Sequence, residues 1–378
     1  MKSRFTSFIM NLVLLLIIFI LSIFGILLYQ EVKENKKISN VEEFVSKKQE
    51  NEGNENIEEK SNTTQVSNNT LEKIAKQDEG KSNLVETEKT KSYRYFYNQL
   101  NTYAKVIYDA LDENKEKMKS GTYKIEFGSR FSALLNEENG TELLEKYYQS
   151  AIETFLADNP DVFYIKPSKL FLTKETITRR NKVTYNVYID NGKNSNYLVD
   201  EFNSEVLVKN AIEKIEEMKK NILSKSMGNS YYDIKMIHNY LIDNVEYESS
   251  ISKGNIYNIY GALINKEAVC EGYAKAFKYL LDGLNIPCVI INGKATNSQG
   301  KTENHAWNGV QIDGKWYGVD VTWDDPIIIG NGKITSDLKY KYFLKGEELF
   351  KQDHIPERRF TEGGEKYTYP VINNTDYR

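Results

Sequence analysis

Two cysteines and three histidines are the side chains of this 378-residue chain best suited to covalent chemistry. Cys270 begins a predicted helix, because apolar residues follow it at helical spacing as far as Gly283. A thiol in the first helical turn faces unpaired backbone N–H groups and the positive dipole end, which favour the nucleophilic thiolate. Cys288 instead lies in an apolar run typical of a buried strand. We therefore predict that Cys270 is the nucleophile, rather than a small buried apolar residue, and that no disulfide joins it to Cys288.

A predicted hairpin supplies partners for the thiol. Residues 305–312 and 315–322 are extended runs, and Asp313-Gly314 between them is a strong signal for a two-residue turn. In that register His305 and Asp320 are diagonal neighbours on one face, with Cα atoms about 7–8 Å apart. An aspartate that accepts a hydrogen bond from one imidazole nitrogen fixes the tautomer and leaves the other nitrogen for a thiol. The register predicts this dyad, whereas its contact with the thiol depends on the fold.

The composition excludes several classes of protein and site. Two cysteines are too few for a disulfide framework or a multi-cysteine zinc site. A net charge of -4 gives no basic excess for nucleic acid, and no glycine-rich nucleotide motif is present. His238 lies on an apolar helix face, so we assign it a structural role, and adjacent Asp324 and Asp325 are weak evidence for a cation site. We predict no cofactor, no metal and no nucleic-acid partner.

The first 92 residues read as an anchor and a tether. Residues 8–29 form a nearly unbroken apolar run, and 22 helical residues span about 33 Å, enough for a bilayer core. This run is too long for a cleaved signal peptide and lacks a small-residue cleavage site, so we favour an uncleaved signal anchor. Residues 1–7 would be a cytoplasmic tail, and the polar residues 30–92 a disordered linker. The predicted location is the cell membrane, single-pass, with the C-terminal domain extracytoplasmic.

The remaining chain reads as two folded parts. Residues 93–225 have mixed helical and extended signals but no cluster of reactive side chains, so we predict an α+β accessory module there. Residues 226–378 contain all the candidate catalytic residues and form the predicted catalytic domain. In the first part we expect helices at 93–111, 143–156 and 206–224, and strands at 124–127, 169–173 and 183–190.

Three motifs surround the candidate catalytic residues: Ala268-Val269-Cys270-Glu271-Gly272-Tyr273-Ala274, Asn304-His305-Ala306-Trp307-Asn308 and Trp316-Tyr317-Gly318-Val319-Asp320-Val321-Thr322-Trp323-Asp324. In their order and spacing, these motifs resemble the bacterial transglutaminase-like superfamily. Tyr342-Phe343-Leu344 and Asp353-His354 resemble the usual continuation of that family.

The resemblance implies both a fold and a reaction. The fold class would be α+β, with a papain-like transglutaminase core in which the nucleophile helix packs on an antiparallel sheet. Cys270 would be the nucleophile, His305 the general base and acid, and Asp320 its orienting partner. The thiolate would attack a carboxamide to give a thioester, which an amine or water then resolves. The superfamily contains transglutaminases, cysteine peptidases, amidases and members without activity.

The oxyanion site is the point where this sequence departs from part of the family. Animal transglutaminases place a tryptophan upstream of the cysteine, whereas all three tryptophans here follow it. The backbone N–H of Cys270 is one expected donor. Tyr260 or Tyr257 is the candidate for a second, and Trp323 is expected to wall the cleft.

The sequence therefore predicts a cell-surface cysteine acyltransferase or hydrolase that acts on a protein or peptide substrate at the cell surface or wall. One alternative is a cysteine protease or amidase acting on surface protein or cell-wall peptide. Another is a non-catalytic surface-binding module, against which the intact triad argues.

Overall fold

The computed structural model describes residues 94–180, 182–250, 253–325, 335–357 and 367–378. These residues belong to one compact unit, which covers 84–378. The predicted tail 1–7, anchor 8–29 and linker 30–92 all lie outside the described residues. Within the described ranges, no helix is both long enough and apolar enough to cross a membrane.

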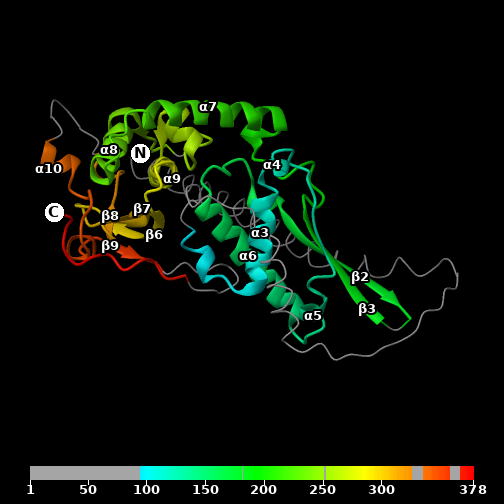
Figure 1. Ribbon diagram of the computed structural model, residues 1–378. Coiled ribbons are helices and arrows are strands. Elements are labelled where there is room, and N and C mark those ends of the chain that lie inside the picture. The colour runs from blue at the N-terminus through cyan, green and yellow to red at the C-terminus, as the bar shows by residue number, and fades with distance from the viewer. Residues whose placement is uncertain (1–93, 181, 251–252, 326–334, 358–366) are drawn as a thin grey trace, which may run out of the picture. The chain divides into compact units, whose positions relative to one another are not determined.

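The accessory module packs helices against a three-stranded sheet. Helix α3 (Thr102–Glu113) begins where the Asn101 side chain accepts a hydrogen bond from the Ala104 N–H at 2.9 Å. Helix α3 packs on α6 (Gly140–Asp158). The module also contains five short helices: η1 (Tyr97–Gln99), α4 (Lys115–Met118), α5 (Ser132–Leu135), η2 (Pro167–Lys169) and η3 (Asp200–Phe202). The sheet has the antiparallel order β1 (Ile125–Gly128), β3 (Lys182–Asp190), β2 (Phe171–Arg179). Figure 1 shows the β2–β3 ribbon projecting beyond the helices.

The β2–β3 ribbon is longer than the sequence predicts. The expected strand 169–173 is observed as Phe171–Arg179, and the chain turns after Arg180, which has a φ of 47°. The difference arises because most of β2 is exposed on both faces, so the alternation of apolar and polar residues that identifies a half-buried strand is missing. The predicted helix at 93–111 is likewise shorter, because its first residues form η1 and Asn101 starts α3.

Two capped helices follow the module. Helix α7 (Glu205–Leu223) begins at Ser204, whose hydroxyl accepts from the Leu207 N–H at 3.4 Å. Helix α8 (Ser230–Asn244) begins at Asn229, whose amide oxygen accepts from the Tyr232 N–H at 3.2 Å. The predicted boundary at 225/226 falls between these two helices, and it stays a prediction.

The second half has a helix packed on an antiparallel sheet, which confirms the predicted fold class. Helix α9 (Cys270–Asp282) has the predicted bounds and contacts β6 (Cys288–Thr296) and β7 (Thr302–Ile312). The sheet order is β8 (Lys315–Val319), β7, β6, β9 (His354–Pro356). Buried Asn308 of β7 joins the layers, because its amide donates to the Ala274 carbonyl of α9 at 3.0 Å and to the Val289 carbonyl of β6 at 3.3 Å. Smaller elements are β4 (Glu246–Tyr247), β5 (Glu267–Ala268), the π-helical turn η4 (Gly261–Asn265), α10 (Ser336–Lys339) and α11 (Glu347–Phe350).

The β7–β8 hairpin has the predicted turn and register. Ile312 pairs with Lys315, and Asp313 and Gly314 both have positive φ, 50° and 74°. A two-residue turn of type I′ requires positive φ at both of its central residues. Strand β8 ends at Val319 rather than at Thr322.

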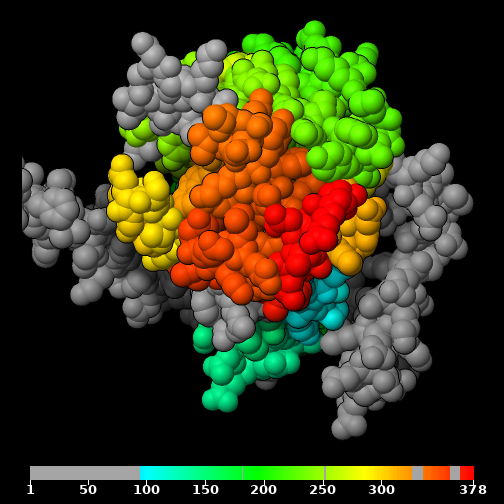
Figure 2. All heavy atoms as spheres, turned by 90° about the vertical axis from the view of Figure 1, so that its left-hand side faces the viewer, coloured from blue at the N-terminus to red at the C-terminus, as the bar shows by residue number. Residues whose placement is uncertain are grey.

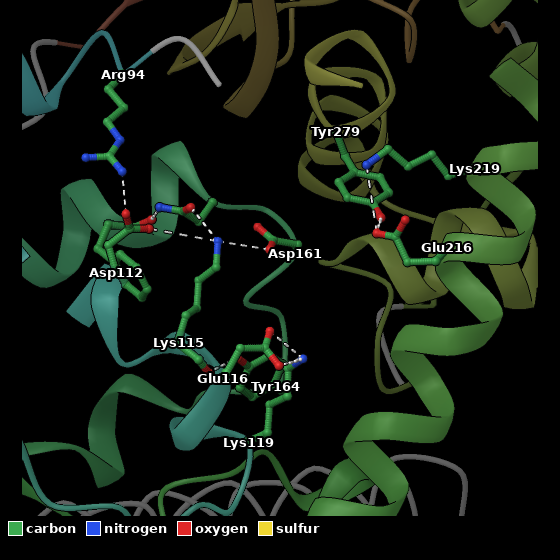
Figure 3. A network of polar contacts seen from close by, with 12 residues as sticks. Arg94, Asp112, Lys115, Glu116, Lys119, Asp161, Tyr164, Glu216, Lys219 and Tyr279 are labelled. Carbon is green, nitrogen blue, oxygen red and sulfur yellow. Dashed lines mark hydrogen bonds and ion pairs between the residues drawn. The ribbon is translucent and has the colours of Figure 1, made fainter. Parts of the chain in front are cut away.

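Charged residues lie where the module meets α7 and α9. The ammonium of Lys278, on α9, is buried and lies 3.0 and 2.9 Å from the two carboxylate oxygens of Asp282, and it also interacts electrostatically with buried Asp158 of α6. Nearby, Lys115 pairs with Asp161 at 3.1 Å. Figure 3 shows Lys115 and Asp161 on one side and Glu216 and Lys219 of α7 with Tyr279 of α9 on the other. A cavity of about 250 Å³ is lined in part by Lys115, Asp161, Glu216 and Tyr279, and these side chains are already paired within the protein.

Candidate active site

The Cys270 side chain lies at the first position of α9 and is half-buried. It packs against Ala274, Ile290 and Ala306, which come from α9, β6 and β7. Val269 precedes it in an extended conformation and offers no side-chain cap, so the first N–H groups of the helix are not occupied by a capping side chain. The predicted helix-start position of the thiol is thus observed. Figure 2 shows the face formed by the sheet and the C-terminal segments, with α8 bordering it.

Gly272 allows the chain to approach the first turn of α9. A Cβ at this position would lie 2.4 Å from the Ile256 carbonyl oxygen and 2.9 Å from the Ala268 Cβ. The Val269 N–H donates to the same Ile256 carbonyl at 3.0 Å. A side chain at 272 would therefore displace the loop that holds the nucleophile in place.

His305 and Asp320 meet as the hairpin register predicts. The His305 Nε2 lies 2.7 Å from the Asp320 Oδ2, and both side chains are largely buried. The second oxygen, Oδ1, accepts from the backbone N–H groups of Thr322 at 3.0 Å and Trp323 at 3.2 Å. These two bonds form a turn after Val319, which is why β8 stops before Asp320.

The electrostatics of the dyad favour a charged pair. Burial opposes charge on Asp320, but His305 and a hydrogen bond from His354 outweigh burial and hold the Asp320 pKa well below its usual range. Burial likewise opposes a charged His305, and the Asp320 carboxylate overcomes it and raises the His305 pKa to about 10. The imidazole is therefore protonated at neutral pH.

His305 also makes the contact that the sequence left to the fold. A side-chain hydrogen bond joins it to Cys270 and contributes to its raised pKa. Because Nε2 is held by Asp320, Nδ1 is the nitrogen that remains for the thiol. A protonated imidazole beside a thiol favours the thiolate, so the structure brings together all three residues of the predicted triad.

His354 is a neighbour of the triad that motif reasoning did not single out as functional. It is buried on β9, with its Nε2 3.1 Å from the Asp320 Oδ2 and its Nδ1 2.7 Å from the Asp353 Oδ1. The only sequence signal was its place in the continuation of the family resemblance. His238, assigned a structural role, is fully buried with its Nε2 3.0 Å from the Asp324 Oδ2.

The candidate cleft residues have different positions. The Trp323 ring lies 5.2 Å from the His305 ring, and its role as a wall of the cleft stays a prediction. Tyr257 is exposed, and its backbone carbonyl accepts from Lys275. The Tyr260 ring packs on Phe202, with centroids 5.0 Å apart, so the structure gives that ring a packing role.

Tyr247 was not among the candidates, although it lies beside the nucleophile. It pairs with Ala268, two residues before Cys270. Burial, followed by the nearby Cys270 side chain, raises the Tyr247 pKa to about 12. The phenol therefore stays protonated and can donate a hydrogen bond at neutral pH. The two-residue strand that places it is too short to produce a periodic signal in the sequence.

The ligand atoms of His305, Asp320 and His354 lie within 4.8 Å of one another, a spacing that could also hold a metal ion. Hydrogen bonds already connect the three side chains through one carboxylate oxygen. A cation bound there would take the place of the hydrogen bond between His305 Nε2 and Asp320. The expectation that no metal takes part stays a prediction.

Comparison with known proteins gives a local match. Residues 217–321 match the family model of the Transglutaminase-like superfamily. Kyphoscoliosis peptidase of Mus musculus is 31% identical over 98 residues, which cover 24% of this chain and 15% of that protein. The Homo sapiens protein of the same name is 30% identical over 101 residues, with the same coverage of 24% and 15%. The match thus spans about 15% of the length of these curated relatives. A solved structure, the crystal structure of a TGase, is 16% identical with a TM-score of 0.28, covering 47% of this chain and 50% of that chain.

The family match contains the helix and the hairpin that form the site. It begins within α7, includes Cys270 and His305, and ends one residue after Asp320. Its order of nucleophile, base and carboxylate is the order in which the structure assembles them. Residues 217–321 of this chain are thus similar to the transglutaminase-like superfamily over the segment that carries the site.

Proposed function

We propose that this protein is a cysteine acyltransferase or hydrolase that forms a thioester from a protein or peptide carboxamide. The observation that carries the proposal is the connected set of Cys270, His305 and Asp320, with Asp320 held ionised and His305 held protonated. A thiolate beside an imidazolium is an activated nucleophile with its proton donor already in place.

The proposed reaction has two half-reactions. The Cys270 thiolate attacks the carbonyl carbon, and the C–S bond forms as the carbonyl becomes an oxyanion. The imidazolium of His305 gives its proton to the leaving nitrogen, the C–N bond breaks, and ammonia or an amine departs from the thioester. His305 then takes a proton from an incoming amine or water, which attacks the thioester and releases the thiolate.

The oxyanion needs donors that are already in position. The backbone N–H of Cys270, at the start of α9, is the first. The protonated phenol of Tyr247 is a better candidate for the second donor than Tyr260, because Tyr247 pairs beside the nucleophile.

Hydrolysis of a peptide bond is the second candidate. Two relatives are named peptidases, although they match over only a small part of their length. Attack on a backbone amide would use the same half-reactions, with a peptide amine as the leaving group and water as the acceptor.

The proposed setting is the outer face of a membrane. The apolar run 8–29 would anchor the chain, the segment 30–92 would act as a tether, and the substrate would be protein or peptide at the cell surface or wall.

One experiment separates these activities. The full chain, in detergent, is incubated with a glutamine-containing protein and a labelled primary amine, and both incorporation of the label and peptide cleavage are followed. Cys270→Ala is the control. Incorporation that requires Cys270 supports transfer, cleavage that requires it supports peptidase activity, and a reactive Cys270 with neither product would favour a binding module.

A further inference from the structure

We propose that His354 is a positioning residue of the active site, which holds the Asp320 carboxylate in the orientation and charge state that His305 needs. The inference rests on the proposed function of the Cys270–His305–Asp320 site. It adds a fourth side chain, from a strand that follows the hairpin in sequence.

The argument begins with the donors on Asp320. One oxygen accepts from two backbone N–H groups, and the other from two imidazoles, His305 at 2.7 Å and His354 at 3.1 Å. The carboxylate is completely buried. A buried carboxylate remains charged only when hydrogen bonds and positive charge replace its lost hydration, so each of these donors supports the ionised form.

A second buried histidine–aspartate pair shows the charge state of an aspartate that accepts a hydrogen bond from one imidazole instead of two. His238 and Asp324 are as deeply buried as the first pair, with 3.0 Å between Nε2 and Oδ2. There burial dominates, and it raises the Asp324 pKa to about 9 and lowers the His238 pKa to about 3. The pair is neutral near pH 7. Asp324 also accepts from the Tyr342 backbone N–H at 2.7 Å, and the nearby Asp320 charge adds to the rise in its pKa. Asp320 differs in that it accepts from a second imidazole.

His305 and His354 lie on β7 and β9, the two strands that pair with the opposite edges of β6. His305 pairs with Gly293 of β6, and on the other side β9 pairs with the same strand, His354 opposite Ala295. Gly293 permits this approach, because a Cβ there would lie 2.2 Å from the Ile355 carbonyl oxygen and 2.7 Å from the Trp307 ring. The two imidazoles therefore reach one carboxylate from strands on both sides of β6.

A hydrogen bond to Asp353 fixes His354 on the side of its ring that faces away from the triad. Its Nδ1 lies 2.7 Å from Asp353, whose other oxygen accepts from the Tyr342 hydroxyl at 2.5 Å. The titratable groups that face its ring are therefore Asp320, Asp353, His305 and Tyr342. A carboxylate lies within hydrogen-bond distance of each ring nitrogen, so the ring has a fixed orientation.

Loss of the hydrogen bond from His354 should affect the Cys270 thiol indirectly, first through Asp320 and then through His305. Asp320 would lose a hydrogen bond that lowers its pKa, and the carboxylate would be freer to rotate away from His305. His305 would then be a weaker support for the thiolate. We expect His354→Leu to move the acid limb of Cys270 alkylation to higher pH by about one unit, which lowers the rate near that limb about tenfold.

The test measures the rate at which iodoacetamide alkylates Cys270 in the full chain from pH 4 to pH 9, by peptide mass spectrometry. His354→Gln supplies an N–H near the position of Nε2 without a ring, and it should return the profile to within about threefold of the wild type. His238→Leu is the matched control, because it removes an equally buried histidine from an aspartate outside the triad. It should destabilise the fold yet keep the wild-type profile.

Three results would overturn the proposal: a His354→Leu profile that superimposes on the wild type, a His354→Gln profile no better than that of His354→Leu, or an equal shift in His238→Leu. If His354→Leu does not fold, Asp353→Asn takes its place, since it weakens the hold on the ring, and an unshifted profile in that variant overturns the proposal. The alkylation rate requires no substrate. The proposed function can therefore fail, through absence of a Cys270-dependent product, while this inference stands.

Discussion

At the scale of the residue, the two cysteines share a side-chain chemistry and differ in environment. Cys270 is half-buried and contacts His305, whereas Cys288 is fully buried at the start of β6. Burial raises the pKa of the Cys288 thiol, so its thiolate is disfavoured at neutral pH.

This difference predicts selective modification. A thiol reagent at pH 7 should label Cys270 well before Cys288, and Cys288→Ala should leave the labelling rate of Cys270 unchanged. Peptide mapping after a short exposure to iodoacetamide measures both sites. Faster labelling of Cys288 would show that the nucleophile has been misassigned.

The dyad makes a second prediction at this scale. Asp320→Asn keeps the shape of the side chain but removes the charge that raises the His305 pKa, so turnover should fall by about 10³–10⁴ while the fold persists. Turnover of His305→Ala should fall by at least the same factor. Turnover is measured in the assay that detects the product, and circular dichroism checks the fold. Near-normal turnover in Asp320→Asn would place the orienting group elsewhere.

At the scale of the element, α9 has two ends with different tasks. Its first turn presents Cys270, and its later turns carry Lys278, whose buried ammonium pairs with Asp282 and interacts electrostatically with the α6 residue Asp158. This charge joins the nucleophile helix to the accessory module, so the module supports the geometry of the site.

Removal of the Lys278 charge should destabilise the folded protein. Lys278→Met leaves the buried Asp158 and the partly buried Asp282 without their cation, and we expect a loss of about 3–5 kcal/mol in the free energy of unfolding. Lys275→Met is the control on the same helix: Lys275 is partly exposed and pairs with Glu271 one turn away, so its loss should stay below about 1 kcal/mol. Urea unfolding compares the two. Equal, small losses would mean that the buried ammonium is not needed.

At the scale of the whole molecule, buried carboxyl groups should set how stability depends on pH. Burial raises the Asp158 pKa to about 7, against about 3.9 in an unfolded chain. Between these values the native state binds a proton that the unfolded state does not, so stability falls as pH rises through this window.

Asp158→Asn isolates this contribution. The variant cannot ionise at 158, so its stability relative to the wild type should improve from pH 5 to pH 7.5, by at most about 1.4 kcal/mol per pH unit. Urea unfolding at pH 5, 6, 7 and 7.5 measures the trend. A constant difference across this range would show that Asp158 keeps an ordinary pKa in the folded protein.

Much of the site follows from local signals in the sequence. The Asp313-Gly314 turn sets the register of β7 and β8, and a register with period two decides that His305 and Asp320 share a face. The start of α9 at Cys270 is likewise local, because apolar spacing and helix ends depend on neighbouring residues. These signals sufficed for the start of α9 at Cys270 and for the shared face of His305 and Asp320, whereas the fold class was implied by the resemblance of the three motifs.

Other features are decided only by the tertiary structure. His354 and Tyr247 reach the site from β9 and β4, short strands with no periodic pattern, and their partners are distant in the sequence. Whether a buried histidine is neutral, like His238, or shares an ionised carboxylate, like His354, depends on how many donors converge on one aspartate. That number is a property of packing between strands and turns, because burial and hydrogen bonding, rather than residue type, determine which form of a carboxyl group the interior stabilises.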